Sequence, residues 1–276
     1  MRQLFALSSL LALASVAVIP APAPAAAQAA SAVSAPIARA VADPRRKPEN
    51  RARDRYRHPA ETLAFFGLKP DMTVAEIWPM SGWYTEILAP MLRNKGKLIG
   101  AAQADGKYRQ QTDALVASDP ARFDKVVLTD FEPSRGASAI APAGTADMVL
   151  TFRNIHNFLM AGDAAAAQAF TDFYTALKPG GVLGIVDHHL PEDRPGDAER
   201  KSGYVKRSTI VRLATAAGFR LAGESEVNAN PKDTADWPGG VWTLPPALSQ
   251  REKDRAKYQA IGESDRLTMK FVKPAG

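Results

Sequence analysis

Residues 73–86 read Thr-Val-Ala-Glu-Ile-Trp-Pro-Met-Ser-Gly-Trp-Tyr-Thr-Glu. The first five are mostly apolar and have the length of a short strand, which predicts a buried strand at 73–77. Pro79 and Gly82 indicate a turn, and the following run predicts a helix at 84–92. A strand, a turn and a helix in this order form one unit of a parallel α/β sheet.

The same alternation continues on both sides of this unit. Six further apolar runs have the length of a strand, at 97–101, 125–129, 147–152, 182–186, 219–224 and 266–272. With the run at 73–77, seven strands are expected. Helices are expected before and between the strands, at 59–66, 108–116, 163–177 and 208–217. The sequence therefore predicts a single α/β domain over 58–276, with a mostly parallel sheet and helices on both faces.

The expected sheet also indicates where a ligand binds. In open α/β sheets, ligands bind beyond the carboxyl ends of the strands. We therefore expect functional residues in the loops that follow five of the strands, at 78–83, 102–107, 130–136, 153–158 and 187–204. Residues 227–257, rich in Pro, Gly and Trp, are expected to form a long excursion from the sheet.

The composition excludes several classes of protein. A chain of 276 residues with 46% hydrophobic and 23% charged residues is not fibrous, collagen-like or wholly disordered. It contains no cysteine. Disulfide frameworks, thiolate nucleophiles and cysteine-ligated metal sites are therefore excluded.

The N-terminus has the features of an export signal. Arg2 precedes 16 uncharged residues at 4–19, and an Ala/Pro tract with small-x-small sites such as Ala27-Gln28-Ala29 follows. A helix over 4–19 would rise about 24 Å, less than the roughly 30 Å core of a bilayer. We expect residues 1–29 to be a signal peptide, and the mature chain to be periplasmic or secreted without stable membrane insertion.

Residues 30–57 are Ala/Pro-rich and then basic. Between Arg39 and Arg57, eight Lys/Arg face three acidic residues, so this segment carries +5 of the total net charge of +6. Because no apolar residues recur at a regular period, we expect a flexible linker. The segment lacks interleaved aromatic residues that would stack on bases, so no nucleic-acid partner is expected. An alternative, in which arginines of this segment fold back over the domain, stays open.

Several motifs occur in an order that is typical of one family. They are Val74-Ala75-Glu76-Ile77, Gly82-Trp83-Tyr84-Thr85-Glu86, Asp130-Phe131-Glu132, Ala146-Asp147-Met148-Val149-Leu150, Thr151-Phe152-Arg153-Asn154-Ile155-His156-Asn157, Leu177-Lys178-Pro179-Gly180-Gly181 and Ala216-Ala217-Gly218-Phe219. Over about residues 50–273 the chain resembles class I S-adenosylmethionine-dependent methyltransferases, and within them a group of exported predicted bacterial members. The resemblance implies a Rossmann-like fold, S-adenosyl-L-methionine as cofactor and methyl transfer to an unidentified small-molecule acceptor.

The resemblance also implies how the cofactor's methionyl tail is held. Glu76 would accept a hydrogen bond from the amino group, while the turn with Ser81 and Gly82 would direct backbone N–H groups to the carboxylate. The family usually has a run of glycines here, whereas Met80 and Ser81 carry Cβ atoms. A positive φ or a close approach of the backbone would conflict with those atoms.

Residues at two further strand ends would contact the adenosyl part of the cofactor. Gln103 lies nearest the acid that usually holds the ribose hydroxyls, and Asp105 is the alternative. Asp130 corresponds to the acid that accepts from the adenine amino group, with Phe131 beside the ring.

Two more cofactor-binding residues are implied near the methionyl end. Arg153 and Asn154 follow the strand at 147–152, where the family's contacts to substrate and methionine lie. Trp83 is expected in the core, while Trp78 is either a core residue or a cover for the cofactor.

Three polar residues are candidates for catalysis. Methyl transfer from a sulfonium is an in-line displacement, so alignment and a dry pocket supply much of the acceleration. A hydroxyl or ammonium acceptor must also lose a proton, which a histidine is suited to accept. The candidates are His156, His188 and Asp187. His156, His188 and His189 follow two adjacent strands and are expected to meet at one rim, while Asp187 ends the second of these strands. Together the four residues offer zinc or manganese ligands, but His188 and His189 diverge in an extended chain, and no metal site is expected.

Two other functions compete with methyl transfer. A noncatalytic exported module would use the same fold to bind a ligand or partner through residues 227–246. A nicotinamide-dependent oxidoreductase is disfavoured, because Gly-x-Gly-x-x-Gly and the acid about 20 residues beyond it are absent. The oligomeric state does not follow from the sequence.

Overall fold

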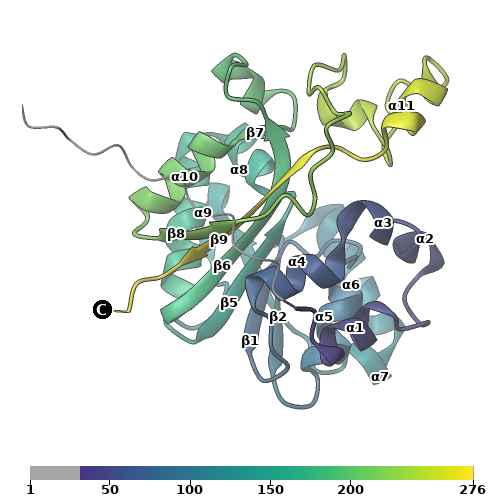
Figure 1. Cartoon of the computed structure of the whole chain (residues 1–276). Coiled ribbons are helices and arrows are strands. Elements are labelled where there is room, and N and C mark those ends of the chain that lie inside the picture. The colour runs from purple at the N-terminus through teal and green to yellow at the C-terminus, as the bar shows by residue number, and fades with distance from the viewer. Residues whose placement is uncertain (1–31, 276) are drawn as a thin grey trace, which may run out of the picture.

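A computed structural model describes residues 32–275, so the expected leader at 1–29 lies outside the described residues. One sheet runs through the molecule in the order β4-β3-β2-β1-β5-β6-β9-β8, and β7 pairs with β6 (Figure 1). β3, β2, β1, β5 and β6 are mutually parallel, whereas β9 runs antiparallel to both of its neighbours, β6 and β8. The strands are β1 (Thr73–Ile77), β2 (Lys97–Ala102), β3 (Val127–Glu132), β4 (Ala137–Ser138), β5 (Ala146–Phe152), β6 (Leu177–Leu190), β7 (Val205–Lys206), β8 (Arg220–Glu224) and β9 (Arg266–Val272).

The seven expected strands are all present, and the two-residue strands β4 and β7 are additional. Helices cover both faces of the sheet, as expected (Figure 1). Successive residues of a strand point to opposite faces, so Val74 packs in one core and Ala75 in the other. The first core lies under α1 (Ala35–Val41), α4 (Pro59–Phe66), α5 (Thr85–Leu92), α6 (Gly106–Ser118) and α7 (Pro120–Phe123). The second lies under α8 (Ile155–Ala161), α9 (Asp163–Ala176) and α10 (Arg207–Ala216).

The expectation of a flexible linker is wrong for residues 35–57. They form α1, α2 (Pro48–Arg51) and α3 (Asp54–Arg57), which pack on the domain. The Arg46 side chain is fully buried, pairs with Asp54 at 2.7 and 2.8 Å, and lies over the Trp83 ring. Carboxylates and an aromatic ring bind the basic residues of this segment. The segment therefore packs on the domain although it contains few apolar residues.

Ile37 of α1 makes this correction testable. Its side chain is 1% exposed within the first core. Ile37→Ala is therefore expected to lower the free energy of unfolding by about 2–5 kcal/mol, the usual cost of such a truncation. Val33→Ala is the control, because Val33 is 39% exposed and should change stability by no more than about 0.5 kcal/mol. Equal urea midpoints for the two variants would contradict the packing of α1.

Two strands extend beyond their expected ends. β6 continues to Leu190 because it pairs with β9 as far as His188, opposite Arg266. β3 continues to Glu132. His188, Asp130 and Phe131 therefore lie in strands, not in the loops where they were expected, and Asp187, expected to end its strand, is followed by three more strand residues.

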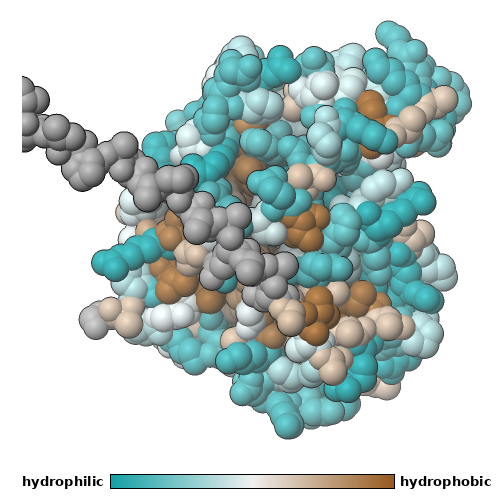
Figure 2. Space-filling view, viewed as in Figure 1, coloured by the Kyte–Doolittle hydropathy of each residue, from teal (hydrophilic) through white to brown (hydrophobic). Residues whose placement is uncertain are grey.

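The excursion lies at the carboxyl ends of the parallel strands. It contains the 3₁₀ helix Gly240–Thr243 (η3) and α11 (Arg255–Ile261), and two further 3₁₀ helices lie elsewhere at Pro133–Arg135 and Gly196–Arg200. Figure 2 shows mainly hydrophilic residues on its outer surface in this view. Apolar side chains such as Val241 and Leu244 are buried. Within residues 32–275, no helix combines the length and apolar character needed to cross a membrane.

Candidate functional site

A cavity of about 300 Å³ lies between the carboxyl ends of the parallel strands and the excursion. This volume is typical of small-molecule sites. Seven of the residues predicted to bind the cofactor or to take part in catalysis line it: Glu76, Ser81, Gln103, Arg153, Asn154, His156 and His188. Val241, Trp242, Leu244 and Pro245 line it from the excursion.

Glu76 presents a buried carboxylate to this cavity, with only 3% of the residue exposed. The Thr85 hydroxyl donates a hydrogen bond to its Oε2 at 2.7 Å. Burial raises the pKa of Glu76 to about 7, although the hydrogen bonds from Thr85 oppose this shift. No cationic side chain in the described part of the chain forms an ion pair with it. Glu76 therefore fits a ligand that brings an ammonium group.

The turn after β1 has three left-handed residues. Trp78, Met80 and Gly82 have φ angles of 48°, 51° and 79°. The positive φ favours glycine at position 82, and a Cβ there would also lie 1.9 Å from Leu115 Cδ2, so that the leucine side chain would have to move. Met80 thus carries its Cβ atom at a positive φ, whereas Ser81 has no positive φ and lies at the exposed mouth. Gly82 shapes the turn without lining the cavity.

Met80→Gly is expected to raise the free energy of unfolding by up to about 1 kcal/mol. Glycine adopts this backbone conformation without the strain that a side chain brings. Ser81→Gly is the neighbouring control, since it relieves no positive φ and adds freedom to the unfolded chain. Urea unfolding measures both variants. A Met80→Gly protein no more stable than the Ser81→Gly protein would contradict strain in the turn.

The two tryptophans of this region have different surroundings. Trp83 belongs to the core, as expected, and its Nε1 donates to the Asn50 carbonyl at 3.1 Å. Trp78 donates from Nε1 to the Phe131 carbonyl at 2.8 Å and packs edge-on against Phe158. Both also border the cavity. Trp78 is therefore a wall of the cavity that is anchored to the core.

Gln103 reaches the cavity from the end of β2. Asp105, the alternative for the same role, is directed to the surface and pairs with Arg135 at 2.7 Å. A neutral amide rather than a carboxylate therefore occupies this strand end.

The structure does not bring Asp130 or Phe131 to the cavity. Asp130 is more than half exposed and forms an ion pair with Arg109 of α6. Phe131, the next residue of β3, points to the other face and is fully buried against Phe158. Phe131 is therefore a core residue and not a neighbour of the adenine ring, while Asp130 lies outside this cavity.

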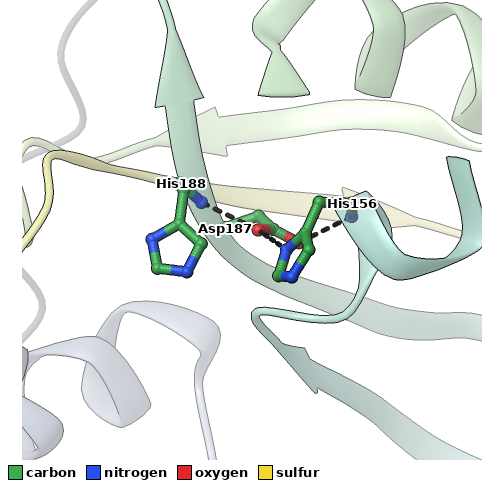
Figure 3. Close-up of side chains that lie close together, drawn as sticks. All are labelled: His156, Asp187 and His188. Atoms are coloured by element: carbon green, nitrogen blue, oxygen red, sulfur yellow. Dashed lines mark hydrogen bonds and ion pairs between the residues drawn. The ribbon is translucent and has the colours of Figure 1, made fainter. Parts of the chain in front are cut away.

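His156 and Asp187 form a buried pair where β5 and β6 end. His156 Nδ1 lies 2.9 Å from Asp187 Oδ1 (Figure 3). Asp187 also accepts hydrogen bonds from the backbone N–H groups of Ile155 at 2.7 Å and His188 at 2.8 Å. A proton held on Nδ1 leaves the Nε2 lone pair of His156 for a ligand. Asp187 does not line the cavity, so it is a positioning residue and not a catalytic one.

Arg153 and Asn154 form the corner between β5 and α8. Arg153 has a φ of 63°, and its backbone N–H donates to the Val186 carbonyl at 2.7 Å. Asn154 is buried and donates from Nδ2 to the Ile77 carbonyl at 2.9 Å. These bonds fix the start of α8, and hence His156, against the ends of β1 and β6.

His188 and His189 diverge, as expected for neighbours in a strand. His188 shares a hydrogen bond with Ser264 at 2.5 Å, and its ring centre lies 5.3 Å from that of His156. Burial lowers the pKa of His188 well below its usual range, and nearby positive charges add to this effect. His189 instead turns to Asp265 at 2.9 Å. His188 is thus a neutral imidazole beside His156.

Ligand atoms of His156, Asp187 and His188 lie within 4.8 Å of one another. Two imidazoles and a carboxylate are suitable ligands for zinc or manganese. Both oxygens of Asp187, however, already accept hydrogen bonds from N–H groups. Arg153 and Arg266 also line the cavity, and their charges oppose a bound cation.

Among the cavity residues that sequence reasoning missed are Arg57, Trp242 and Arg266. Arg57 lies in the segment expected to be a linker, although its folding back onto the domain was an open alternative. The Trp/Pro content of the excursion indicated ligand binding, but only for the noncatalytic alternative. The side-chain direction of Arg266 depends on the pairing of β9 with β6.

Comparison with known proteins shows similarity at the level of fold. No protein-family model and no curated protein sequence matches the chain. A SAM-dependent methyltransferase from Aquifex aeolicus is 17% identical, with a TM-score of 0.55 over 80% of this chain and 93% of that chain. The [4+2]-cyclase SpnF is 14% identical, with a TM-score of 0.52 over 82% and 81%. YcgJ of Bacillus subtilis is 15% identical, with a TM-score of 0.51 over 78% and 97%. The Rossmann-like fold of methyltransferases is thereby confirmed.

Proposed function

We propose that the protein transfers a methyl group from S-adenosyl-L-methionine to a small-molecule acceptor. The observation that carries the proposal is the Glu76 carboxylate, buried beside the cavity without a cationic partner in the described part of the chain. The methionyl tail supplies the ammonium group that Glu76 lacks. Its carboxylate would take backbone N–H groups of the turn before α5, because those of Thr85, Glu86 and Ile87 already donate to Glu76, Gly82 and Tyr84. Gln103 lines the same cavity and can hydrogen-bond a ribose hydroxyl.

The remaining residues support a displacement reaction. When bound, the cofactor supplies an electrophilic methyl group on a sulfonium. Trp242 and Leu244 wall the cavity and limit water around the reacting atoms. In such a displacement the acceptor's lone pair would form its bond to the methyl carbon while the carbon–sulfur bond breaks and its electron pair stays on the sulfur, and His156 Nε2 would accept the acceptor's proton. Asp187 holds the ring and stabilises the imidazolium that results.

Calorimetric titration with S-adenosylmethionine and S-adenosylhomocysteine tests the proposal. Binding in the micromolar range, equivalent to about 8 kcal/mol, is the expected result. An absence of heat at millimolar ligand would exclude cofactor-dependent methyl transfer. Such a result would favour the second candidate function, a ligand-binding module on the same fold.

Specific features favour that second candidate. Trp78 and Met80 occupy left-handed positions of the turn, where side chains restrict the approach of a ligand to the backbone. SpnF, which has a similar fold, is a [4+2]-cyclase. The fold alone therefore does not prescribe methyl transfer.

We also propose that residues 1–29 direct export and are removed. The uncharged run at 4–19 and the small residues before Ala30 support this processing. N-terminal sequencing of the mature protein tests it, and a protein that retains Met1 in the membrane fraction would contradict it. An enzyme outside the cytosol would also need a supply of the cofactor.

A further inference from the structure

Three guanidinium groups from distant parts of the chain meet at the cavity. Arg57 ends α3, Arg153 follows β5 and Arg266 begins β9. All three line the cavity, and all three also line a small adjoining hollow with the stacked rings of Tyr84 and Phe152. The arginines therefore surround a common region next to a flat aromatic wall.

The positive charge of this cluster exceeds the negative charge bonded to it. Glu263, only 2% exposed, accepts hydrogen bonds from Arg53 Nε at 2.6 Å, from Arg57 Nε at 3.1 Å and from Arg266. The Arg153 guanidinium forms no hydrogen bond or ion pair with any residue in 32–275. Even with Asp187 counted as a second nearby carboxylate, four arginines face two negative charges.

The cluster also contains donors without acceptors. Arg57 and Arg266 are 5% and 4% exposed. Nη2 of Arg57, Nε of Arg266 and Nη2 of Arg53 are buried without a hydrogen-bond partner among the described residues. Burial and the neighbouring cations lower the pKa of Arg57 well below its usual range. Buried polar groups of native proteins are normally paired, so these groups indicate a ligand that supplies oxygen acceptors.

We infer that the methyl acceptor is a small oxyanion, and that Arg57, Arg153 and Arg266 bind its carboxylate or phosphate group. Guanidinium groups match both oxyanions with paired hydrogen bonds. His156 and His188 line the same cavity, so the bound molecule lies within reach of the proposed base. The inference rests on the proposed function only in naming the occupant as the acceptor. An anionic acceptor would also balance the positive sulfonium of the cofactor.

Binding of simple anions tests this inference without knowledge of the acceptor. Benzoate and inorganic phosphate are titrated into the mature protein by calorimetry, with and without saturating S-adenosylhomocysteine. Benzamide, a neutral isostere of benzoate, is the ligand control. We expect benzoate and phosphate to bind in both conditions, and benzamide to bind at least about tenfold more weakly than benzoate, because it forms no charge-assisted hydrogen bonds.

Matched variants identify the groups responsible. Arg57→Met, Arg266→Met and Arg153→Met are each expected to weaken benzoate binding about tenfold or more. Arg55→Met is the control, because Arg55 lies in the same short helix as Arg57 but is exposed and outside the cavity. Arg153→Met breaks no side-chain hydrogen bond in the described chain, so it remains informative if the buried variants do not fold.

The outcomes separate this inference from the proposed function. Competition between benzoate and S-adenosylhomocysteine would overturn the inference, because the arginines would then hold the cofactor's carboxylate. Equal binding of benzamide, or unchanged binding by the arginine variants, would also overturn it. Arginine-dependent anion binding without any binding of S-adenosylhomocysteine would uphold the anion site and reject methyl transfer. Binding of S-adenosylhomocysteine without arginine-dependent anion binding would reject the anion site and leave the proposed function standing.

Discussion

Replacement of His156 by alanine is expected to lower turnover about 10²–10⁴-fold, the usual loss when a positioned base is removed. The side chain lines the cavity, and Asp187 holds its Nδ1 at 2.9 Å so that Nε2 is available to the acceptor. Affinity for the cofactor should stay within about threefold, or roughly 0.6 kcal/mol, because His156 is assigned to the acceptor. Release of S-adenosylhomocysteine measures turnover, and calorimetry measures affinity.

Two other histidines serve as controls for this variant. His189→Ala should keep nearly wild-type turnover, since His189 is bonded to Asp265 and lies outside the cavity. His188→Ala should cause an intermediate loss, because this neutral ring lines the cavity beside His156. Wild-type rates in His156→Ala at both pH 6 and pH 8 would contradict a base at this position and leave proximity as the source of catalysis.

Replacement of Glu76 is expected to produce the largest loss of cofactor affinity. Glu76→Ala removes a charge-assisted hydrogen bond to the ammonium group, which costs about 1–3 kcal/mol, or roughly 5- to 150-fold in Kd. Asp130→Ala is the matched control. Asp130 is also an acid near a strand end, but it is exposed, paired with Arg109 and outside the cavity. Equal losses in both variants would contradict the assignment of Glu76.

The raised pKa of Glu76 adds a pH dependence to this prediction. Because the carboxyl group titrates at about 7 in the folded protein, cofactor affinity should fall as the pH falls below 7. In Glu76→Gln this dependence should be absent. The contribution of Glu76 to the stability of the folded protein changes with pH in the direction opposite to cofactor affinity. Between the unfolded pKa of about 4.5 and the folded pKa of about 7, the folded state binds more protons, so this residue's contribution to stability decreases as the pH rises. The stability of Glu76→Gln relative to wild type should therefore be higher at pH 8 than at pH 5.

The strands and most of the larger helices could be predicted from local sequence. The run at 73–77 is apolar and bounded by turn residues, and the structure places β1 at those positions. The strand ends were less predictable, because β6 reaches Leu190 through its pairing with β9. The segment at 35–57 was misjudged for another reason. Its buried arginines are stabilised by Asp54, Glu263 and Trp83, which hydrophobic periodicity does not reveal.

The candidate site was predictable only in part. Glu76 was identified through the family resemblance, and His156 and His188 because residues that follow adjacent parallel strands meet at one edge of the sheet. Phe131 was misplaced because the alternation of side chains along β3 turns it into the core. Asp187 was expected at the end of a strand, but only the structure shows that its carboxylate lies behind His156 instead of in the cavity.

The sequence by itself determined that this protein is an α/β chain with its candidate chemistry at the carboxyl ends of the strands. It could do so because periodicity and turn residues act over a few neighbouring positions. Only the tertiary structure decided that Arg57 and Arg266 meet Glu263 beside His156. Arg57 and Glu263 are 206 residues apart in the chain. Their contact depends on how α3 packs against the excursion and β9, and local sequence does not encode such a contact.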